Sequence, residues 1–249
     1  MKAFRQKGTR YVARLDGVER HVVAQLAVDV AELLGATPVQ IVAALGDLAD
    51  DVGDADDADG ADVADGPEGV ADDGGERPEP WDLPGLGGLE AALSGLDPSS
   101  DPEVPDVPLD PALRRLLPSA SADAEVAAEF RRFTQVDLRA LKIARLLALV
   151  RALDAGAAKE RLAVPRDRAD LLAGALVDIR LVIAERLGLD SDESADALYD
   201  ELARAEDGDG PGSTGEALRL HLATAYAALT WLQETLVAAQ LADLDGPDA

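Results

Sequence analysis

The chain begins with a short stretch in which apolar and polar positions alternate. Tyr11, Ala13 and Leu15 alternate with Val12 and Arg14, which is the period of two expected of a strand. The segments 3–6 and 10–15 flank a Lys-Gly-Thr sequence, and a glycine between two such segments is typical of a hairpin turn. The pattern therefore predicts a two-stranded hairpin at the N-terminus.

Helical spacing replaces this alternation after residue 15. Asp16 and Glu19 have the spacing of a capping box at the start of a first helix, which we expect to end at Gly35. A second helix is predicted to begin at Thr37 and Pro38, a capping residue followed by proline in the first turn. The apolar positions of the two helices are Leu26, Val30, Leu33, Leu34, Ile41, Leu45 and Leu48.

The second half of the chain has helical periodicity throughout. We expect a short helical turn between Pro108 and Pro118, a long helix over 122–153, a helix opened by Pro165 and closed by Gly188, and a weaker one over 191–204. The long helix carries the apolar positions Val126, Phe130, Phe133, Leu138, Leu141, Ile143, Leu146, Leu149 and Leu153. The next helix carries Leu172, Leu176, Ile179, Ile183 and Leu187.

The last helix has apolar residues at alternating steps of four and three. This is heptad spacing, and it is typical either of a core helix in a bundle or of an intermolecular coiled coil; we favour the bundle. The positions concerned are Leu218, Leu222, Ala225, Leu229, Leu232, Leu236 and Ala239.

The segment 51–107 has a different composition. It holds 18 acidic residues against one basic residue, Arg77, and so carries −17 of the net charge of −26. With so few apolar residues it cannot offset the entropy of ordering, and we expect a disordered Pro/Gly-rich linker with possible short order near Trp81 or in 86–96. The sequence thus predicts a mainly α protein: residues 1–50 and 108–249 form one helical bundle with the hairpin, and 51–107 are inserted into it.

Composition narrows the chemistry further. The 249 residues include no cysteine and two histidines, and aromatic residues make up 3%. Disulfides, thiolate nucleophiles and thiolate metal sites are excluded, and we expect no catalytic residues, cofactor or metal.

In the acidic segment, aligning Gly60 with the glycine of a calcium-binding loop puts Ala55 and Gly66 at the first and last ligand positions. Neither residue has a side-chain oxygen, so the segment does not match a calcium-binding loop. No apolar run approaches the length of a membrane span, and we expect a cytoplasmic protein.

Basic residues gather on the predicted long helix in spite of the acidic total. Arg131, Lys142 and Arg145 lie near one face, because separations of 11 and 14 residues approximate whole helical turns. These residues form either a solvated helix face or a docking surface for an acidic partner, and the sequence favours the solvated face. The other basic residues of the helix are Arg132, Arg139 and Arg151.

Four segments of the chain, in this order, have a family resemblance. They are "FRQKGTRYVARLD", "DPALRRLLPSASADAEVAAEFRRFTQVDLRALKIA", "DLLAGALVDIRLVIAERLGL" and "YAALTWLQETLVAA". They resemble the AosR family of actinobacteria, formerly a domain of unknown function, and the acidic segment is a departure from that family. The matched residues with charged or aromatic side chains are Arg131, Arg132, Asp178, Arg180, Trp231 and Glu234.

The resemblance implies a regulator of the oxidative-stress response that partners a stress sigma factor and raises expression of cysteine-biosynthesis genes. Redox sensing in that family is attributed to a disulfide, which a chain without cysteine cannot form. The matched residues could equally be structural: Asp178 and Arg180 as members of ion pairs, and Trp231 as an anchor of the bundle.

The sequence leads to two hypotheses of function. The first is a non-enzymatic transcriptional regulator that contacts a protein partner, a sigma factor or RNA polymerase, without gripping DNA itself. The second is a structural or adaptor protein without a transcriptional role. Under the first hypothesis the candidate partner-binding residues are Arg131, Arg132, Arg139, Lys142, Asp178, Arg180, Trp231 and Glu234.

The lack of cysteine gives a first testable prediction. Mild peroxide should cause no disulfide-dependent shift in gel mobility and no change of fold, because Met1 is the only sulfur-containing side chain. Near-UV circular dichroism before and after peroxide, and again after dithiothreitol, measures this. A peroxide-induced change of fold that dithiothreitol reverses would contradict the prediction.

Overall fold

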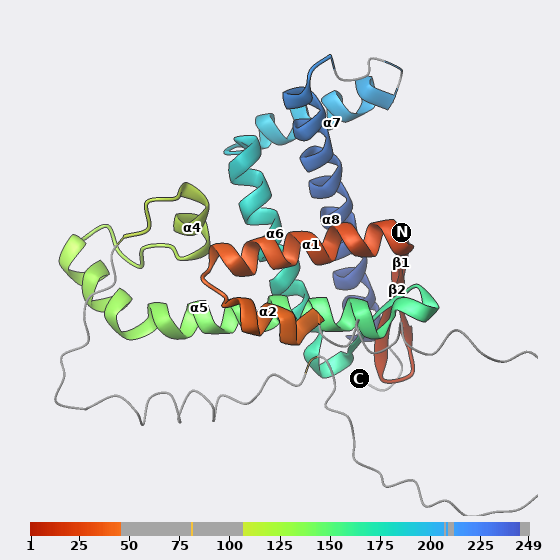
Figure 1. Cartoon of the computed structure of the whole chain (residues 1–249), viewed down its shortest axis with the longest axis horizontal. Helices are drawn as coiled ribbons and strands as arrows, with labels where there is room; N and C mark the ends of the chain where they lie inside the picture. The colour runs from red at the N-terminus through yellow and green to blue at the C-terminus, as the bar shows by residue number, and fades with distance from the viewer. Residues whose placement is uncertain (46–80, 82–106, 207, 209–211, 245–249) are drawn as a thin grey trace, which may run out of the picture.

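The computed structural model describes residues 1–45, 81, 107–206, 208 and 212–244. Most of the segment 51–107, including 86–96, lies outside the described residues, as does Leu48. The described part is mainly helical, as the sequence predicts, with a small antiparallel sheet beside the N-terminus (Figure 1).

The capping box and the hairpin are both confirmed. Strands β1 (Lys2–Lys7) and β2 (Arg10–Arg14) pair antiparallel on either side of Gly8, whose φ of 60° suits a glycine in the turn. Helix α1 (Gly17–Leu33) begins where the Asp16 carboxylate accepts the Glu19 N–H and the Glu19 carboxylate accepts the Asp16 N–H. Helix α2 (Pro38–Leu45) begins with the Thr37 hydroxyl accepting the Gln40 N–H.

The sheet has a third strand that the sequence did not reveal. Strand β3 (Arg161–Pro165) pairs with β2, so that the order is β1-β2-β3, and Pro165 ends this strand instead of opening a helix. Tyr11 and Ala13 of β2 lie opposite Val164 and Leu162 of β3, and all four side chains are buried. The predicted hairpin is therefore one part of a three-stranded sheet.

The helices of the second half lie close to their predicted positions. They are α4 (Pro111–Leu116), α5 (Ala124–Ala155), α6 (Ala169–Leu187), α7 (Asp192–Glu206) and α8 (Thr214–Leu244), with one-turn 3-10 helices at Ala157–Lys159 and Arg166–Arg168. Leu229, Leu232 and Leu236 of α8 are buried against the core. The preference for a core helix over a coiled coil is confirmed for this part of α8, whereas Leu218 is exposed.

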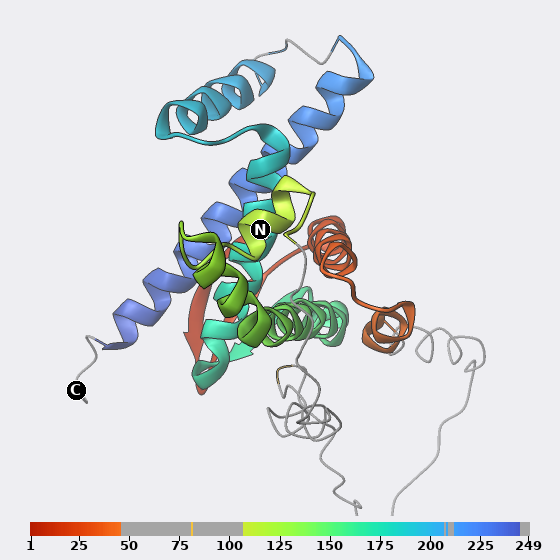
Figure 2. The ribbon, with the colours of Figure 1, turned by 90° about the vertical axis from the view of Figure 1, so that its left-hand side faces the viewer.

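Two pairs of helices cross one another and form the core. Helices α1 and α5 pack together, α6 and α8 pack together, and the second pair runs across the first (Figures 1 and 2). Helix α7 connects α6 to α8 at the end farthest from the sheet, and β1 packs against α8 (Figure 1). In the part of the chain that the structure describes, one hydrophobic cluster joins residues from before and after the acidic segment.

Trp81 belongs to this core although it lies within the acidic segment. Its side chain is 1% exposed, and its indole Nε1 donates to the Ala163 carbonyl of the edge strand β3 at 2.9 Å. The short order that the sequence left possible near Trp81 is present at this residue. The segment 51–107 therefore contributes a core side chain at this position.

Replacement of Trp81 tests this anchor. Trp81→Ala should lower the free energy of unfolding by about 3–5 kcal/mol, because it removes a large buried side chain. Trp81→Phe should cost less, since a ring remains and only the hydrogen bond to Ala163 and part of the volume are lost. Urea unfolding followed by circular dichroism measures both values. A Trp81→Ala variant as stable as the wild type would show that the indole does not anchor the core.

Candidate functional site

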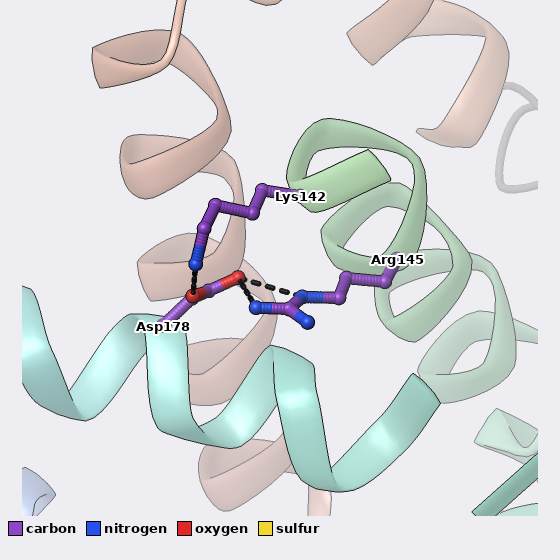
Figure 3. A network of polar contacts seen from close by, with 3 residues as sticks. All are labelled: Lys142, Arg145 and Asp178. Atoms are coloured by element: carbon purple, nitrogen blue, oxygen red, sulfur yellow. Dashed lines mark hydrogen bonds and ion pairs between the residues drawn. The ribbon is translucent and has the colours of Figure 1, made fainter. Parts of the chain in front are cut away.

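The most buried charge in the described residues is the carboxylate of Asp178. Its side chain lies in the middle of α6, is 0% exposed, and faces two cations of α5 (Figure 3). Lys142 Nζ donates to Asp178 Oδ1 at 2.5 Å, and Arg145 Nε donates to Oδ2 at 2.7 Å, with a further contact from the second guanidinium nitrogen. Both carboxylate oxygens are thus bound by cations, which offsets the cost of removing the charge from water.

Gly174 makes room for this cluster. A Cβ atom at position 174 would lie 2.4 Å from Arg145 Nη1, so any other residue there would require the guanidinium to shift from its present place. Lys142 is itself buried. Because Lys142 and Asp178 bind each other inside the protein, they offer no accessible charge to a partner. They are therefore removed from the docking surface that the sequence suggested.

The first half of α5, residues 124–138, has its apolar side chains on the outside. We call this half the α5 arm; within it only Ala127 and Gln135 are buried. Phe130 is 49% exposed and Phe133 58% exposed, although the whole chain has only three phenylalanines. Val126 and Val136 are exposed beside them. These four side chains form an exposed apolar stripe along the arm.

The arginines of the arm are half-buried and lie on the side of α5 that continues its buried face. The Arg132 guanidinium lies 4.8 Å from the centre of the Phe133 ring, a cation–π contact on the surface. Arg131 forms no ion pair with the described residues, and its Nε atom is buried without a hydrogen-bond partner there. Two acids of α6 are bound to other cations: Asp178 to Lys142 and Arg145, and Glu185 to Arg115 at 2.5 Å.

Arg139 fixes the base of the arm. Its Nη1 atom donates to the carbonyl of Leu34, at the end of α1, at 3.3 Å. Farther along the arm, the Thr134 hydroxyl donates to the Phe130 carbonyl at 2.8 Å, a contact that bends helices. The first turns of α5 tilt away from the line of its second half (Figure 1). The arm therefore projects from the bundle beyond the point where Arg139 ties α5 to α1.

The remaining candidate residues lie on other surfaces. Arg180 donates to Gln233 Oε1 at 2.8 Å, and its guanidinium lies 5.1 Å from the centre of the Tyr226 ring, so it joins α6 to α8. Glu234 is exposed. Trp231 is 38% exposed, so it does not anchor the core as suggested. Of the eight candidates, the structure brings Lys142 and Asp178 into direct contact, and Arg131 and Arg132 remain together on the arm.

Two polar contacts with shifted pKa values hold the ends of the bundle. The Arg186 side chain donates to Asp110 and holds the pKa of that carboxyl below its usual value, with help from the Ala112 N–H at the start of α4. Burial raises the pKa of the Tyr11 hydroxyl, and its hydrogen bond to Asp243 at 2.9 Å raises it further. Both groups tie elements together and lie away from the arm.

The described residues include neither a cluster of metal ligands nor a membrane-spanning helix. No group of three or more histidine, aspartate or glutamate side chains there is arranged to hold a metal ion. No helix among them combines the length and the apolar character needed to cross a membrane.

Comparison with family models identifies the relatives of this sequence. Residues 1–240 match the model of a domain of unknown function, DUF2017. The chain belongs to the DUF2017 family. The match extends over the sheet, the arm and all of the core helices, so the DUF2017 domain is the whole bundle. No curated protein and no solved structure was found that matches the sequence.

Sequence reasoning missed the outward direction of the arm's phenylalanines. The sequence pattern groups Phe130 and Phe133 with Leu146 and Leu153 as apolar positions of one helix. Separations of 16 residues (130 to 146) and 20 residues (133 to 153) are about 4.4 and 5.6 helical turns, so the phenylalanines lie on the face opposite the buried leucines. One signal was available in the DUF2017 sequence: Arg131, Arg132 and Gln135 occupy the positions that continue the buried face of α5 toward its N-terminus. The arm is therefore inverted relative to the core: its arginines lie on the inner face of α5 and its phenylalanines on the outer face.

The buried cluster at Asp178 gives a prediction about stability. Asp178→Ala should lower the free energy of unfolding by about 3–5 kcal/mol, because it leaves two cations without a counterion between α5 and α6. Asp170→Ala, at an exposed position of the same helix, is the matched control and should cost less than about 1 kcal/mol. Chemical denaturation measures both. Equal stability of the two variants would show that the cluster does not hold the helices together.

Proposed function

We propose that this DUF2017 protein is a non-enzymatic regulator of transcription that acts by binding another protein through the α5 arm. The observation that carries the proposal is the exposed apolar stripe, with the Arg132 guanidinium against its Phe133 ring and Arg131 half-buried next to it in the chain. Exposed aromatic side chains next to arginines are characteristic of the centres of protein interfaces. The partner's surface combines carboxylates with apolar side chains.

The charge distribution supports an acidic partner. The chain as a whole carries a net charge of −26, and in this acidic protein Arg131 has no counterion among the described residues. A carboxylate from a partner would supply one. The arm also carries Glu129 and Asp137, so the sign of the partner's surface can be tested by changing charges of either sign on one helix.

The resemblance to the AosR family supports a transcriptional partner. The segment from Glu129 to Thr134, which matches that family, lies within the arm. That family implies a stress sigma factor as the partner and cysteine-biosynthesis genes as the target. We propose a sigma factor bound to RNA polymerase as the partner, and a cytoplasmic location follows from that role. Because the chain has no cysteine, any response to oxidants would have to lie in the partner or in the amount of the protein.

The experiment measures stability and binding on the same variants. Arg131→Glu together with Arg132→Glu should weaken binding to purified RNA polymerase holoenzyme at least about tenfold, since reversing charges at an interface adds repulsion. The melting temperature should change little, because both arginines are partly exposed and Arg131 makes no ion pair with the described residues that the substitution would remove. Holoenzymes carrying the housekeeping and the stress sigma factors are compared by surface plasmon resonance.

Two further measurements make the result specific. Glu129→Lys changes charge in the opposite sense on the same arm and should leave binding unchanged or make it tighter. Phe130→Ala with Phe133→Ala should abolish binding while the fold remains intact. Unchanged affinity in the folded arginine variant would remove the arm from consideration, and failure of the wild type to bind either holoenzyme would contradict the transcriptional role.

A further inference from the structure

A cavity separates α1 from α8 on a face of the bundle that the arm does not share. Its volume is about 410 Å³. Helix α1 contributes Val18, Val22 and Leu26, spaced one turn apart, and α8 contributes Ala225, Ala228 and Trp231. The α8 wall carries small side chains opposite the larger ones of α1, so the space between the helices is left unfilled. We call this cavity the α1/α8 groove.

The polar groups in the wall of the groove are almost all bound within the protein. The Glu19 carboxylate accepts the N-terminal ammonium of Met1 and the Asp16 N–H. The Thr224 hydroxyl donates to the Leu220 carbonyl at 2.8 Å. The exceptions are His221 and Trp231, whose imidazole and indole groups have no hydrogen-bond partner among the described residues. The wall therefore offers an apolar surface with two polar groups still available.

The size of the groove selects the kind of occupant. Pockets for small molecules span about 300–1,000 Å³, and the groove lies within that range. The groove therefore has the size of a small-molecule site.

We propose that the α1/α8 groove binds an apolar small molecule with one hydrogen-bonding group. The apolar body of the ligand lies between the valines of α1 and the alanines of α8, and its polar group bonds to His221. An uncharged ligand fits best, because the lining is mostly apolar and Glu19, its carboxylate, is already paired with the Met1 ammonium. The groove is independent of the α5 arm, so this site can exist whether or not the arm binds a partner.

The test uses N-phenyl-1-naphthylamine, an uncharged fluorescent probe with a single N–H group. The full-length chain should bind it saturably at one site, with increased probe fluorescence and with quenching of Trp231 by energy transfer. Ala228→Phe fills the groove and should weaken binding at least about tenfold. Ala238→Phe adds the same ring at an exposed position of α8 outside the groove and should bind like the wild type.

Further variants keep the test decisive. If Ala228→Phe does not fold by circular dichroism, Val22→Phe fills the groove from the α1 side and should give the same loss. In His221→Leu, 1-decanol should displace the probe several-fold less effectively than in the wild type, because its hydroxyl loses the imidazole. Absence of saturable binding, or equal binding by a folded filled variant and Ala238→Phe, would overturn the proposal.

Discussion

The carboxylate of Asp178 determines where α5 and α6 meet. A buried charge is tolerated only when its partners are fixed in place, and here Lys142 and Arg145 bind both oxygens from one face of α5. Sliding α5 by one residue along α6 would turn both cations away from the carboxylate. The contact therefore sets the register of the two helices, and Gly174 leaves room for the Arg145 guanidinium that forms part of it. Apolar packing alone would tolerate several such registers.

The position of this cluster divides α5 into two parts. Beyond Lys142 the helix is nearly continuously buried, from Leu146 to Leu153, whereas before Arg139 it carries Phe130 and Phe133 on the outside. The cluster and the hydrogen bond from Arg139 to Leu34 hold α5 at one point along its length. The α5 arm lies outside this buried stretch, and Leu138 at its base packs against the core.

Most elements could be predicted from the sequence because their signals are local. The capping box at Asp16 lies within four residues, and the heptad spacing of α8 lies within one helix. Strand β3 was missed because its pairing with β2 joins residues about 150 positions apart, and five residues ending in proline give no local signal. For the same reason, the sequence could not decide whether Trp81 is buried: its hydrogen-bond partner, the Ala163 carbonyl, is distant in sequence. Of the candidate site, sequence reasoning identified the arginines of the arm but not the direction of the phenylalanines.

The exposure of these phenylalanines is costly in a chain with so few aromatic residues. Full burial of one such side chain contributes about 1.5–3 kcal/mol, a large fraction of the net stability of a typical domain. On the inner face of the α5 arm, where a phenylalanine would be buried, the chain has Arg131, Arg132 and Gln135 instead. Folding alone favours the opposite arrangement, in which the phenylalanines point inward and the arginines outward. The inverted arm is therefore best explained by a requirement outside the folding of this chain, which is the argument for a partner on this surface.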